Sequence, residues 1–319
     1  NGLLVINLQD ETNFGKLELL VPIEDTTSSD IINSVPASVS LVTADTGRGA
    51  DYSGGLVYTS DLEGKITKVN LTNLTNDINN SKSLIFKPST GAVDTTTLFK
   101  AGSTKANGRY MYYAMDIAIG KTTNNLWLFA GTGDAQRLND RSSGTDNLLI
   151  GIQDPDYPYY GEVKTPGTAD DISNCKDTSN DQTGKNCPTS NHRGWYIKLK
   201  DYAKTTAEPT VNNGLVYFPT YTPSKSANKC DLGNAFICVA DDECGTHKNY
   251  LKSSSASEQS GQICTYVGKG VLSKIVFFAG KLFANISGKA IVGPATDLVS
   301  TDAATGEVQT YRKSWRENF

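Results

Sequence analysis

Paired carboxylates are the first candidates for chemistry in this sequence. They occur at Asp154-Pro155-Asp156, at Asp170-Asp171 and at Asp241-Asp242-Glu243. Two neighbouring carboxyl groups could serve a glycosidase as its acid and its nucleophile or base. Polar loops of an acidic protein contain such pairs by default, so we predict that these carboxylates are solvated and have no catalytic role.

The two histidines and a glycine motif give little further support for catalysis. His192 and His247 both lie in polar stretches near cysteines, and the sequence has no G-x-S-x-G or H-E-x-x-H motif. We predict that both histidines are loop-surface residues. Gly131-Thr132-Gly133 begins like a dinucleotide-binding fingerprint, but position 136 is Gln instead of a third Gly. These glycines are therefore interpreted as a turn that needs a permissive backbone.

The cysteines could form disulfides or bind zinc. There are six, at Cys175, Cys187, Cys230, Cys238, Cys244 and Cys264. A structural zinc site usually has closely spaced pairs such as C-x2-C, which this sequence lacks. An even number of cysteines in long polar loops predicts disulfides, and hence the periplasm or the cell exterior. We favour a bond between Cys175 and Cys187, which would close a short ring, and leave the pairing of the other four open.

Short strands must position these groups, because no convincing amphipathic helix is present. Apolar runs rich in β-branched and aromatic residues end at Gly-centred turns throughout the chain, for example at 3–8, 56–58, 126–130, 215–218 and 282–286. This pattern is typical of strands and hairpins. We predict one all-β domain over residues 1–319. Two long polar stretches, about 154–193 and 222–262, are predicted to be insertions or binding loops braced by disulfides.

Charge and hydropathy exclude two classes of partner. The formal net charge is −4, and Lys65, Lys68, Lys82 and Lys100 are scattered singly rather than clustered as nucleic-acid binding would require. We predict that these lysines lie on solvated strand faces. No apolar run approaches the roughly 18 residues of a membrane-spanning segment.

Several other residues are assigned structural roles. Trp127, Trp195 and Trp315 are predicted to pack in the core or between sheets. Asp61 and Gly64 are predicted to form a tight turn, in which the Asp accepts hydrogen bonds from backbone N–H groups and the Gly adopts a positive φ.

Six segments, in order from Val57 to Glu317, resemble the C-terminal domain of the PilC/PilY family of type IV pilus assembly factors and adhesins. VYTSDLEGKITKV at 57–69 is similar to the family's VYAGDLxGNLWRFDL. FAGTG at 129–133, LIGIQD at 149–154 and RGWYIKL at 193–199 resemble FGTG, YGIWD and GWYLDL. VYFPTYTP at 216–223 resembles VYFTTFTP, which a Cys follows in the family and Cys230 follows here, and SWRE at 314–317 is shared. Each match alone is weak, but six in the same order are far more specific.

The resemblance implies an irregular β-propeller of a modified seven-bladed type, with its first blades preceding Asn1. It further implies a non-catalytic protein at the pilus tip or outer cell surface, exported through the periplasm. The implied partners are minor pilins or the pilus tip complex, and a host or abiotic surface ligand. The implied roles are pilus assembly, countering of retraction, and adhesion.

Calcium is the one cofactor that the resemblance suggests. Family members often carry an EF-hand-like loop before the strand that corresponds to 57–60, and Ca²⁺ needs six to eight oxygen ligands. The corresponding stretch here, 45–55, has only Asp45 and Asp51 as acidic residues, with Arg48 between them. We therefore predict a Gly-rich turn, with Asp45 and Asp51 as the side-chain ligands if a metal binds.

Two alternative functions remain open. A quinoprotein-type dehydrogenase also uses a propeller, but it would show regularly repeated Trp motifs, and the three Trp residues here are irregularly spaced. A lectin-like propeller could stack sugars on Tyr157, Tyr159 and Tyr160, although ordinary packing of this Tyr-rich and Pro-rich loop onto the scaffold is the favoured interpretation.

Overall fold

The computed structural model describes residues 1–8, 11–12, 14–42, 55–71, 95–142, 144–157, 160, 164–226, 228, 231–247, 264–287 and 296–302. Within these ranges the regular structure is β, apart from one short 3-10 helix, η1 (Ile172–Asn174). The all-β prediction is therefore confirmed. No helix of the described residues is both long and apolar enough to cross a membrane.

The N-terminal part of the chain forms two sheets. Sheet 1 is the antiparallel pair β1 (Gly2–Ile6) and β2 (Leu17–Pro22). Sheet 2 has the strand order β10-β6-β5-β4-β3, built from β3 (Ser40–Val42), β4 (Leu56–Ser60), β5 (Lys65–Asn70), β6 (Thr95–Lys100) and β10 (Asp170–Asp171). The strands β3 to β6 are consecutive in the chain and antiparallel, whereas β10 is a later segment that adds in parallel to β6.

Sheet 3 repeats this arrangement at the centre of the molecule. Its order is β11-β12-β9-β8-β7, from β7 (Asp116–Ile119), β8 (Leu126–Gly131), β9 (Leu148–Asp154), β11 (Cys175–Asp177) and β12 (Gly194–Lys198). The predicted loop 154–193 thus contributes β10 to the outer edge of sheet 2 and β11 to the outer edge of sheet 3. Asp170 in this segment forms ion pairs with Lys164 and Arg193.

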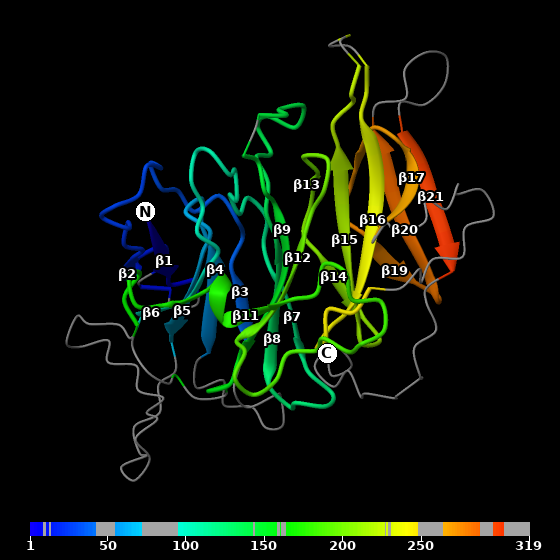
Figure 1. Cartoon of the computed structure of the whole chain (residues 1–319). Helices are drawn as coiled ribbons and strands as arrows, with labels where there is room; N and C mark the ends of the chain where they lie inside the picture. The colour runs from blue at the N-terminus through cyan, green and yellow to red at the C-terminus, as the bar shows by residue number, and fades with distance from the viewer. Residues whose placement is uncertain are drawn as a thin grey trace.

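The C-terminal part forms two more sheets. Sheet 4 comprises β13 (Lys204–Thr205), β14 (Thr210–Asn212), β15 (Leu215–Thr222), β16 (Asn234–Asp241) and β17 (Cys264–Lys269). Sheet 5 comprises β18 (Val271–Leu272), β19 (Val276–Phe278), β20 (Lys281–Ser287) and β21 (Thr296–Asp302). The sheets follow one another across the molecule from blue to red (Figure 1). Among the described residues, no strand pairing joins sheet 5 to sheet 1.

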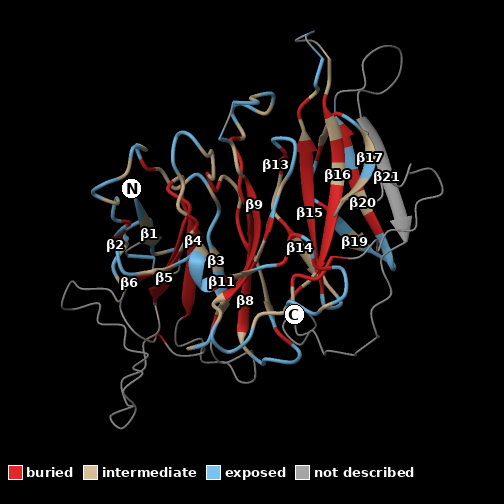
Figure 2. Cartoon of the chain, viewed as in Figure 1, coloured by how far each residue is buried: buried red, intermediate tan, exposed pale blue. Residues whose placement is uncertain are grey.

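Neighbouring sheets pack face to face over apolar cores. Successive side chains of a strand point to opposite faces, so β8 sends Leu126 and Leu128 toward sheet 2 and Trp127 and Phe129 toward sheet 4. This explains why the central strands read as continuous apolar runs and are buried along their length (Figure 2). Further cores lie between sheets 4 and 5 and between sheets 1 and 2.

The tryptophans occupy the core between sheets 3 and 4, as predicted. Trp127 and Trp195 are buried, and Trp195 packs edge-on against Phe218 of sheet 4. The Trp195 ring lies directly over Gly151, where a Cβ atom would come within 2.4 Å of it. Trp315 lies outside the described residues.

The prediction that the lysines lie on solvated faces is wrong for Lys65 and Lys68, which are both buried. The Lys65 ammonium lies 2.6 Å from Glu63 and 3.5 Å from Asp61, and it also donates to the backbone carbonyl of Glu24. Buried charges are tolerated only when they are paired and hydrogen-bonded, and both lysines meet that condition. Lys100 is half-buried, and Lys82 lies outside the described residues.

The turn before β5 forms as predicted. Asp61 accepts a hydrogen bond from the backbone N–H of Lys65 at 3.0 Å, and Gly64 has a φ of +68°. A second oxygen of Asp61 accepts from the Asn33 side-chain amide at 2.9 Å, which fastens segment 23–34 over the turn. Burial raises the pKa of Asp61 even though the charge of Lys65 opposes this effect.

Candidate functional site

The loops of sheets 3 and 4 gather at two opposite ends of the strands. At one end lie the turns 120–125 and 213–214, the loop 178–193 and the turn 241–247, which we call the disulfide end. At the other end lie the loops 132–147, 199–206 and 222–233, which we call the cavity end (Figure 1). The antiparallel order of β7, β8, β9 and β12, and of β15 and β16, fixes this division.

A disulfide between Cys187 and Cys244 joins two loops at the disulfide end. The expected bond between Cys175 and Cys187 is therefore wrong. Sequence proximity favoured it, but Trp195 at the start of β12 donates to the backbone carbonyl of Asp242 at 2.8 Å and brings the turn 241–247 beside Cys187. Disulfides are confirmed as a class, because Cys238 and Cys264 also bond, at directly opposed positions of β16 and β17.

Of the two remaining cysteines, the structure describes only Cys175. Cys175 is a free thiol in β11, buried against the core between sheets 2 and 3. Burial raises the pKa of Cys175 to about 12, so the reactive thiolate is scarce at neutral pH. Cys230 lies outside the described residues.

Asp181 organises the loop that carries Cys187. Its carboxylate accepts backbone hydrogen bonds from Thr183 and Gly184 at 3.0 Å and from Asn186 at 2.8 Å. Burial alone would raise the pKa of Asp181, but these hydrogen bonds outweigh it and lower the pKa. The Asp181 carboxylate therefore stabilises the conformation of the loop rather than binding a ligand.

His247 follows the disulfide-bonded turn and is buried, so its predicted surface position is wrong. Its backbone N–H donates to the carbonyl of Asp181 at 3.2 Å, and among the described residues its Nδ1 atom has no hydrogen-bond partner. Burial lowers its pKa, because the charged imidazolium is disfavoured away from water. His192, in contrast, is half-buried and lies within hydrogen-bond distance of the Thr189 hydroxyl.

The carboxylates of the turn 241–247 are not simply solvated. Asp241 accepts from the backbone N–H groups of Glu243 and Cys244, and Glu243 accepts from those of Thr122 and Thr123 in the β7–β8 turn. Asp242 is buried. Burial and the neighbouring charges of Asp241 and Glu243 raise the pKa of Asp242 to about 6.

We expect Asp242→Asn to stabilise the protein at neutral pH. The folded state holds the Asp242 proton more tightly than the unfolded chain does, so stability should fall as pH rises from about 4 through 6. Asn cannot ionise, so its free energy of unfolding should exceed that of the parent by about 1–3 kcal/mol at pH 7.5 and match it near pH 4. Urea unfolding across this range measures the difference, with the exposed Asp201→Asn as control. A constant difference at every pH would contradict the prediction.

The carboxylate of Asp154 is also buried, which contradicts its predicted solvation. It accepts a hydrogen bond from the Tyr58 hydroxyl at 2.7 Å and forms an ion pair with Lys68 at 2.7 Å. Burial and the charge of Asp154 raise the pKa of Tyr58, so its hydroxyl remains a donor. This group joins β4 and β5 of sheet 2 to the end of β9 in sheet 3.

The tyrosines that the lectin-like alternative would use as a platform do not face solvent at the positions that are described. Tyr160 is buried, with its ring centroid 5.7 Å from the Lys68 ammonium, and Tyr157 packs partly against the core between sheets 2 and 3. Packing onto the scaffold thus describes both residues. Tyr159 lies outside the described residues.

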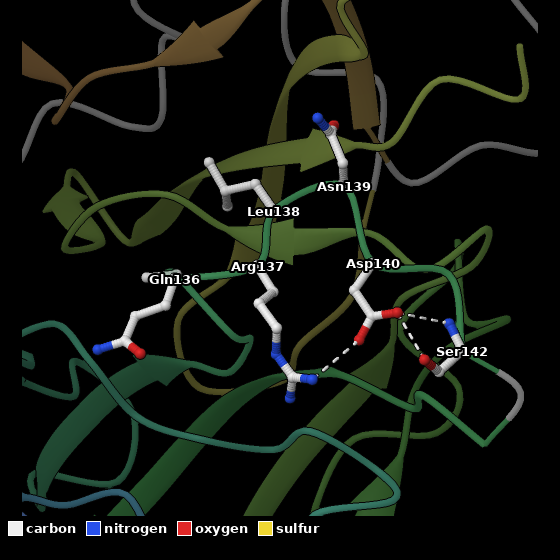
Figure 3. Close-up of a pocket in the computed structure, with 7 residues that line it drawn as sticks. Gln136, Arg137, Leu138, Asn139, Asp140 and Ser142 are labelled. Atoms are coloured by element: carbon white, nitrogen blue, oxygen red, sulfur yellow. Dashed lines mark hydrogen bonds and ion pairs between the residues drawn. The ribbon is translucent and has the colours of Figure 1, made fainter. Parts of the chain in front are cut away.

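The cavity end contains an open depression of about 610 Å³, which sequence analysis missed (Figure 3). It is lined by one loop between β8 and β9, through Ala135, Gln136, Arg137, Leu138, Asn139, Asp140 and Ser142. Arg137 is exposed; its guanidinium lies 2.7 Å from Asp134 and 3.8 Å from Asp140. The only sequence signal for this loop was the preceding glycine motif.

The side chain of Lys204 is hydrogen-bonded to the backbone of this loop. Its buried ammonium donates to the backbone carbonyls of Asp140 at 2.7 Å and of Leu138 and Tyr202 at 3.2 Å. Gly131 and Gly133 permit β13 to approach, because a Cβ atom at either position would meet Thr205 or Lys204 at less than 3 Å. The glycine motif is thus a close-approach turn, as its structural interpretation predicted.

Two hydrogen bonds of the Tyr221 hydroxyl fasten the rim of the depression. The Tyr221 hydroxyl donates to the Asn139 side chain at 2.6 Å and accepts from the backbone N–H of Gly233 at 2.9 Å. The loop 135–142 is therefore tied to both β13 and the β15–β16 hairpin. Such a surface offers a guanidinium, carboxylates and amides in fixed positions, which suits recognition of a polar ligand.

The described residues contain no group of three or more His, Cys, Asp or Glu side chains that could hold a metal ion. Asp45 and Asp51, named as side-chain ligands if a metal binds, lie outside them, as does the Gly-rich turn predicted at 45–55 except for Gly55.

Comparison with known proteins finds similarity both in sequence and in structure. Over 195 residues the chain is 24% identical to a type IV pilus biogenesis factor PilY1 homolog from Xylella fastidiosa, a match that covers 58% of this chain and 13% of that protein. The crystal structure of the Pseudomonas aeruginosa PilY1 C-terminal domain superposes with a TM-score of 0.61 at 15% identity, covering 95% of this chain and 66% of that one. No family model matches the chain.

These matches confirm the resemblance that the six sequence motifs indicated. The structural similarity extends over nearly the whole chain and shows the fold of a PilY1 C-terminal domain. The chain spans only a small part of the curated relative that it matches.

Proposed function

We propose that this chain is a non-catalytic binding module associated with type IV pili, acting in pilus assembly and surface adhesion. The observation that carries the proposal is the superposition of 95% of the chain on a PilY1 C-terminal domain. The sequence match to a pilus biogenesis factor supports the same assignment independently. Two disulfides support an extracellular location after export through the periplasm.

In this proposal the five sheets are part of a closed propeller of the modified seven-bladed type. Sequential antiparallel sheets that pack face to face support this arrangement. The scaffold presents loops for two kinds of partner: minor pilins or a tip complex, and a ligand on a host or abiotic surface. The long loops 155–192 and 223–262 are our candidates for docking a minor pilin or a host ligand, and we assign the pilus contact to neither of them.

We place the adhesive contact at the cavity end. Arg137 is 62% exposed, and Lys204 and Tyr221 fasten the loop that presents it. A fixed loop loses little conformational entropy on binding, so the exposed guanidinium, which Asp134 already holds through Nε, can offer its remaining N–H groups to a polar surface group.

An Arg137→Ala variant of the complete protein, expressed in its own bacterium, tests both parts of this proposal. We expect normal numbers of surface pili but roughly tenfold fewer attached cells, as about 1.4 kcal/mol of lost binding would give. Asp134 keeps its backbone hydrogen bonds from Gln136 and Arg137, so the loop should persist.

Lys225→Ala is the matched control, because Lys225 is an exposed, ion-paired cation at the same end. Unchanged attachment in Arg137→Ala would remove the cavity from the proposal. Unchanged piliation and attachment after deletion of the whole chain would refute the pilus assignment itself.

A further inference from the structure

Three ionisable side chains are buried together at the turn between β4 and β5. Asp61, Glu63 and Lys65 are each at most 3% exposed, and Asn33 beside them is 5% exposed. The Lys65 ammonium lies 2.6 Å from a carboxylate oxygen of Glu63 and 3.5 Å from one of Asp61. One lysine nitrogen is therefore held beside two carboxyl groups, away from bulk water.

The charges of this group do not balance when both carboxyl groups are ionised. Two negative charges would then face one ammonium in the protein interior, where an uncompensated charge is costly. Burial raises the pKa of Asp61 although the charge of Lys65 opposes this effect, so Asp61 is the group that takes up a proton. Burial alone would also raise the pKa of Glu63, but its hydrogen bonds with Lys65 and with the backbone N–H of Thr26 outweigh it and lower the pKa.

Two carboxyl groups with opposite pKa shifts take opposite chemical roles. Asp61 is the neutral carboxylic acid, whose carbon a nucleophile can attack, and Glu63 is the carboxylate that can act as a base. The lysine amine, once it has lost a proton, is the nucleophile. An acid, a base and a nucleophile thus occupy one buried turn.

We propose that Lys65 and Asp61 condense to form an intramolecular amide bond, with Glu63 as the general base. Glu63 takes one proton from the Lys65 ammonium, and the free amine attacks the carboxyl carbon of protonated Asp61. The bond between Nζ and that carbon forms, and the bond from the carbon to its hydroxyl breaks. The second proton leaving Nζ passes to the hydroxyl, which departs as water. Glu63 ends protonated, so the site is neutral before and after the reaction, and no other reactant is needed.

The fold favours this reaction in three ways. The backbone N–H of Lys65 and the side-chain amide of Asn33 fix the Asp61 carboxyl group, and fixed neighbours react as if at high concentration. Condensation removes a buried ammonium and so removes the cost of its desolvation. Exclusion of water from the site slows hydrolysis of the product. The bond would cross-link the β4–β5 turn covalently, and its formation does not depend on the pilus or adhesion parts of the proposed function.

Mass spectrometry of the purified 319-residue chain tests the proposal. After the disulfides are reduced and the chain is unfolded, we expect an intact mass that is lower than the sequence mass by one water. Trypsin does not cut after a lysine whose amine is acylated, so residues 49–68 should appear as one peptide, uncut at Lys65 and one water lighter. Cleavage after Lys68, a buried lysine outside the proposed bond, is the internal control.

Two substitutions separate the bond from its catalyst. Lys65→Arg keeps a positive charge but has no primary amine, so it should show the full sequence mass. Glu63→Gln keeps the size of the side chain but cannot take up the proton, so the linked fraction should fall by at least about tenfold. Tryptophan fluorescence establishes that each variant is folded, and the measurement on the parent protein requires no variant.

Four results would contradict the proposal. An intact mass equal to the sequence mass, with complete cleavage after Lys65, would show that no bond forms. Loss of one ammonia instead of one water would assign the bond to the Asn33 amide. Loss of one water that persists in Lys65→Arg would come from other residues. An undiminished linked fraction in folded Glu63→Gln would reject Glu63 as the base.

Discussion

Replacing Asp154 by Ala is expected to lower the free energy of unfolding by about 3–5 kcal/mol, because it leaves the Lys68 ammonium buried without its carboxylate. The carboxylate also accepts the hydroxyl of Tyr58, and a buried donor that loses its acceptor adds to the cost. Since the three residues join sheets 2 and 3, urea unfolding followed by tryptophan fluorescence should show the loss. Asp156→Ala, two residues further on and only partly buried, should cost less than about 1 kcal/mol.

A compensated variant separates the cost of an unpaired charge from the value of the ion pair. In Tyr58→Phe/Lys68→Met/Asp154→Leu no polar group of the three is left without its partner, and apolar replacements of buried ion pairs are often neutral. We expect this triple variant to recover most of the stability that Asp154→Ala loses. A cost below about 1 kcal/mol for Asp154→Ala would show that water reaches this group.

Removing the Cys187–Cys244 disulfide is expected to cost about 4 kcal/mol. The two cysteines are 57 residues apart in the sequence. Without the bond the unfolded chain gains entropy, which favours unfolding. Cys187→Ala/Cys244→Ala, compared with the parent by urea unfolding, gives the value directly. In the same variant Trp195 keeps its hydrogen bond to the Asp242 carbonyl, so the core between sheets 3 and 4 should remain intact.

The second disulfide provides the matched comparison. Cys238 and Cys264 are separated by 26 residues, so chain entropy predicts a smaller cost for Cys238→Ala/Cys264→Ala, by roughly 0.7 kcal/mol. If both double variants cost less than about 1 kcal/mol, the unfolded chain must already be compact around these loops.

Local pattern was enough to predict the strands and the core tryptophans. Trp127 and Trp195 lie within apolar runs bounded by turns, and such runs bury their side chains whichever face they present. The turn at Asp61 and Gly64 was predictable for the same reason, because the interactions that form it span only a few residues.

The charged core and the disulfide pairing were not predictable in this way. Nothing near Lys68 indicates that the carboxylate of Asp154 meets it, since the contact forms only when sheets 2 and 3 pack. Likewise, Cys244 reaches Cys187 through the register of β15 and β16 and the anchoring of Asp242 on Trp195. The cavity loop escaped notice because its fixed shape depends on Lys204 and Tyr221, which are distant in sequence.

The segment between β9 and β12 has a mechanical consequence. It adds β10 to the edge of sheet 2 and β11 to the edge of sheet 3, so one continuous segment pairs with both sheets. Sliding these sheets past each other under tension would have to tear two short parallel ladders and the Asp170 ion pairs together. A force applied across this junction therefore acts in shear on the hydrogen bonds of both sheets at once. It does not separate the strands of one sheet one at a time.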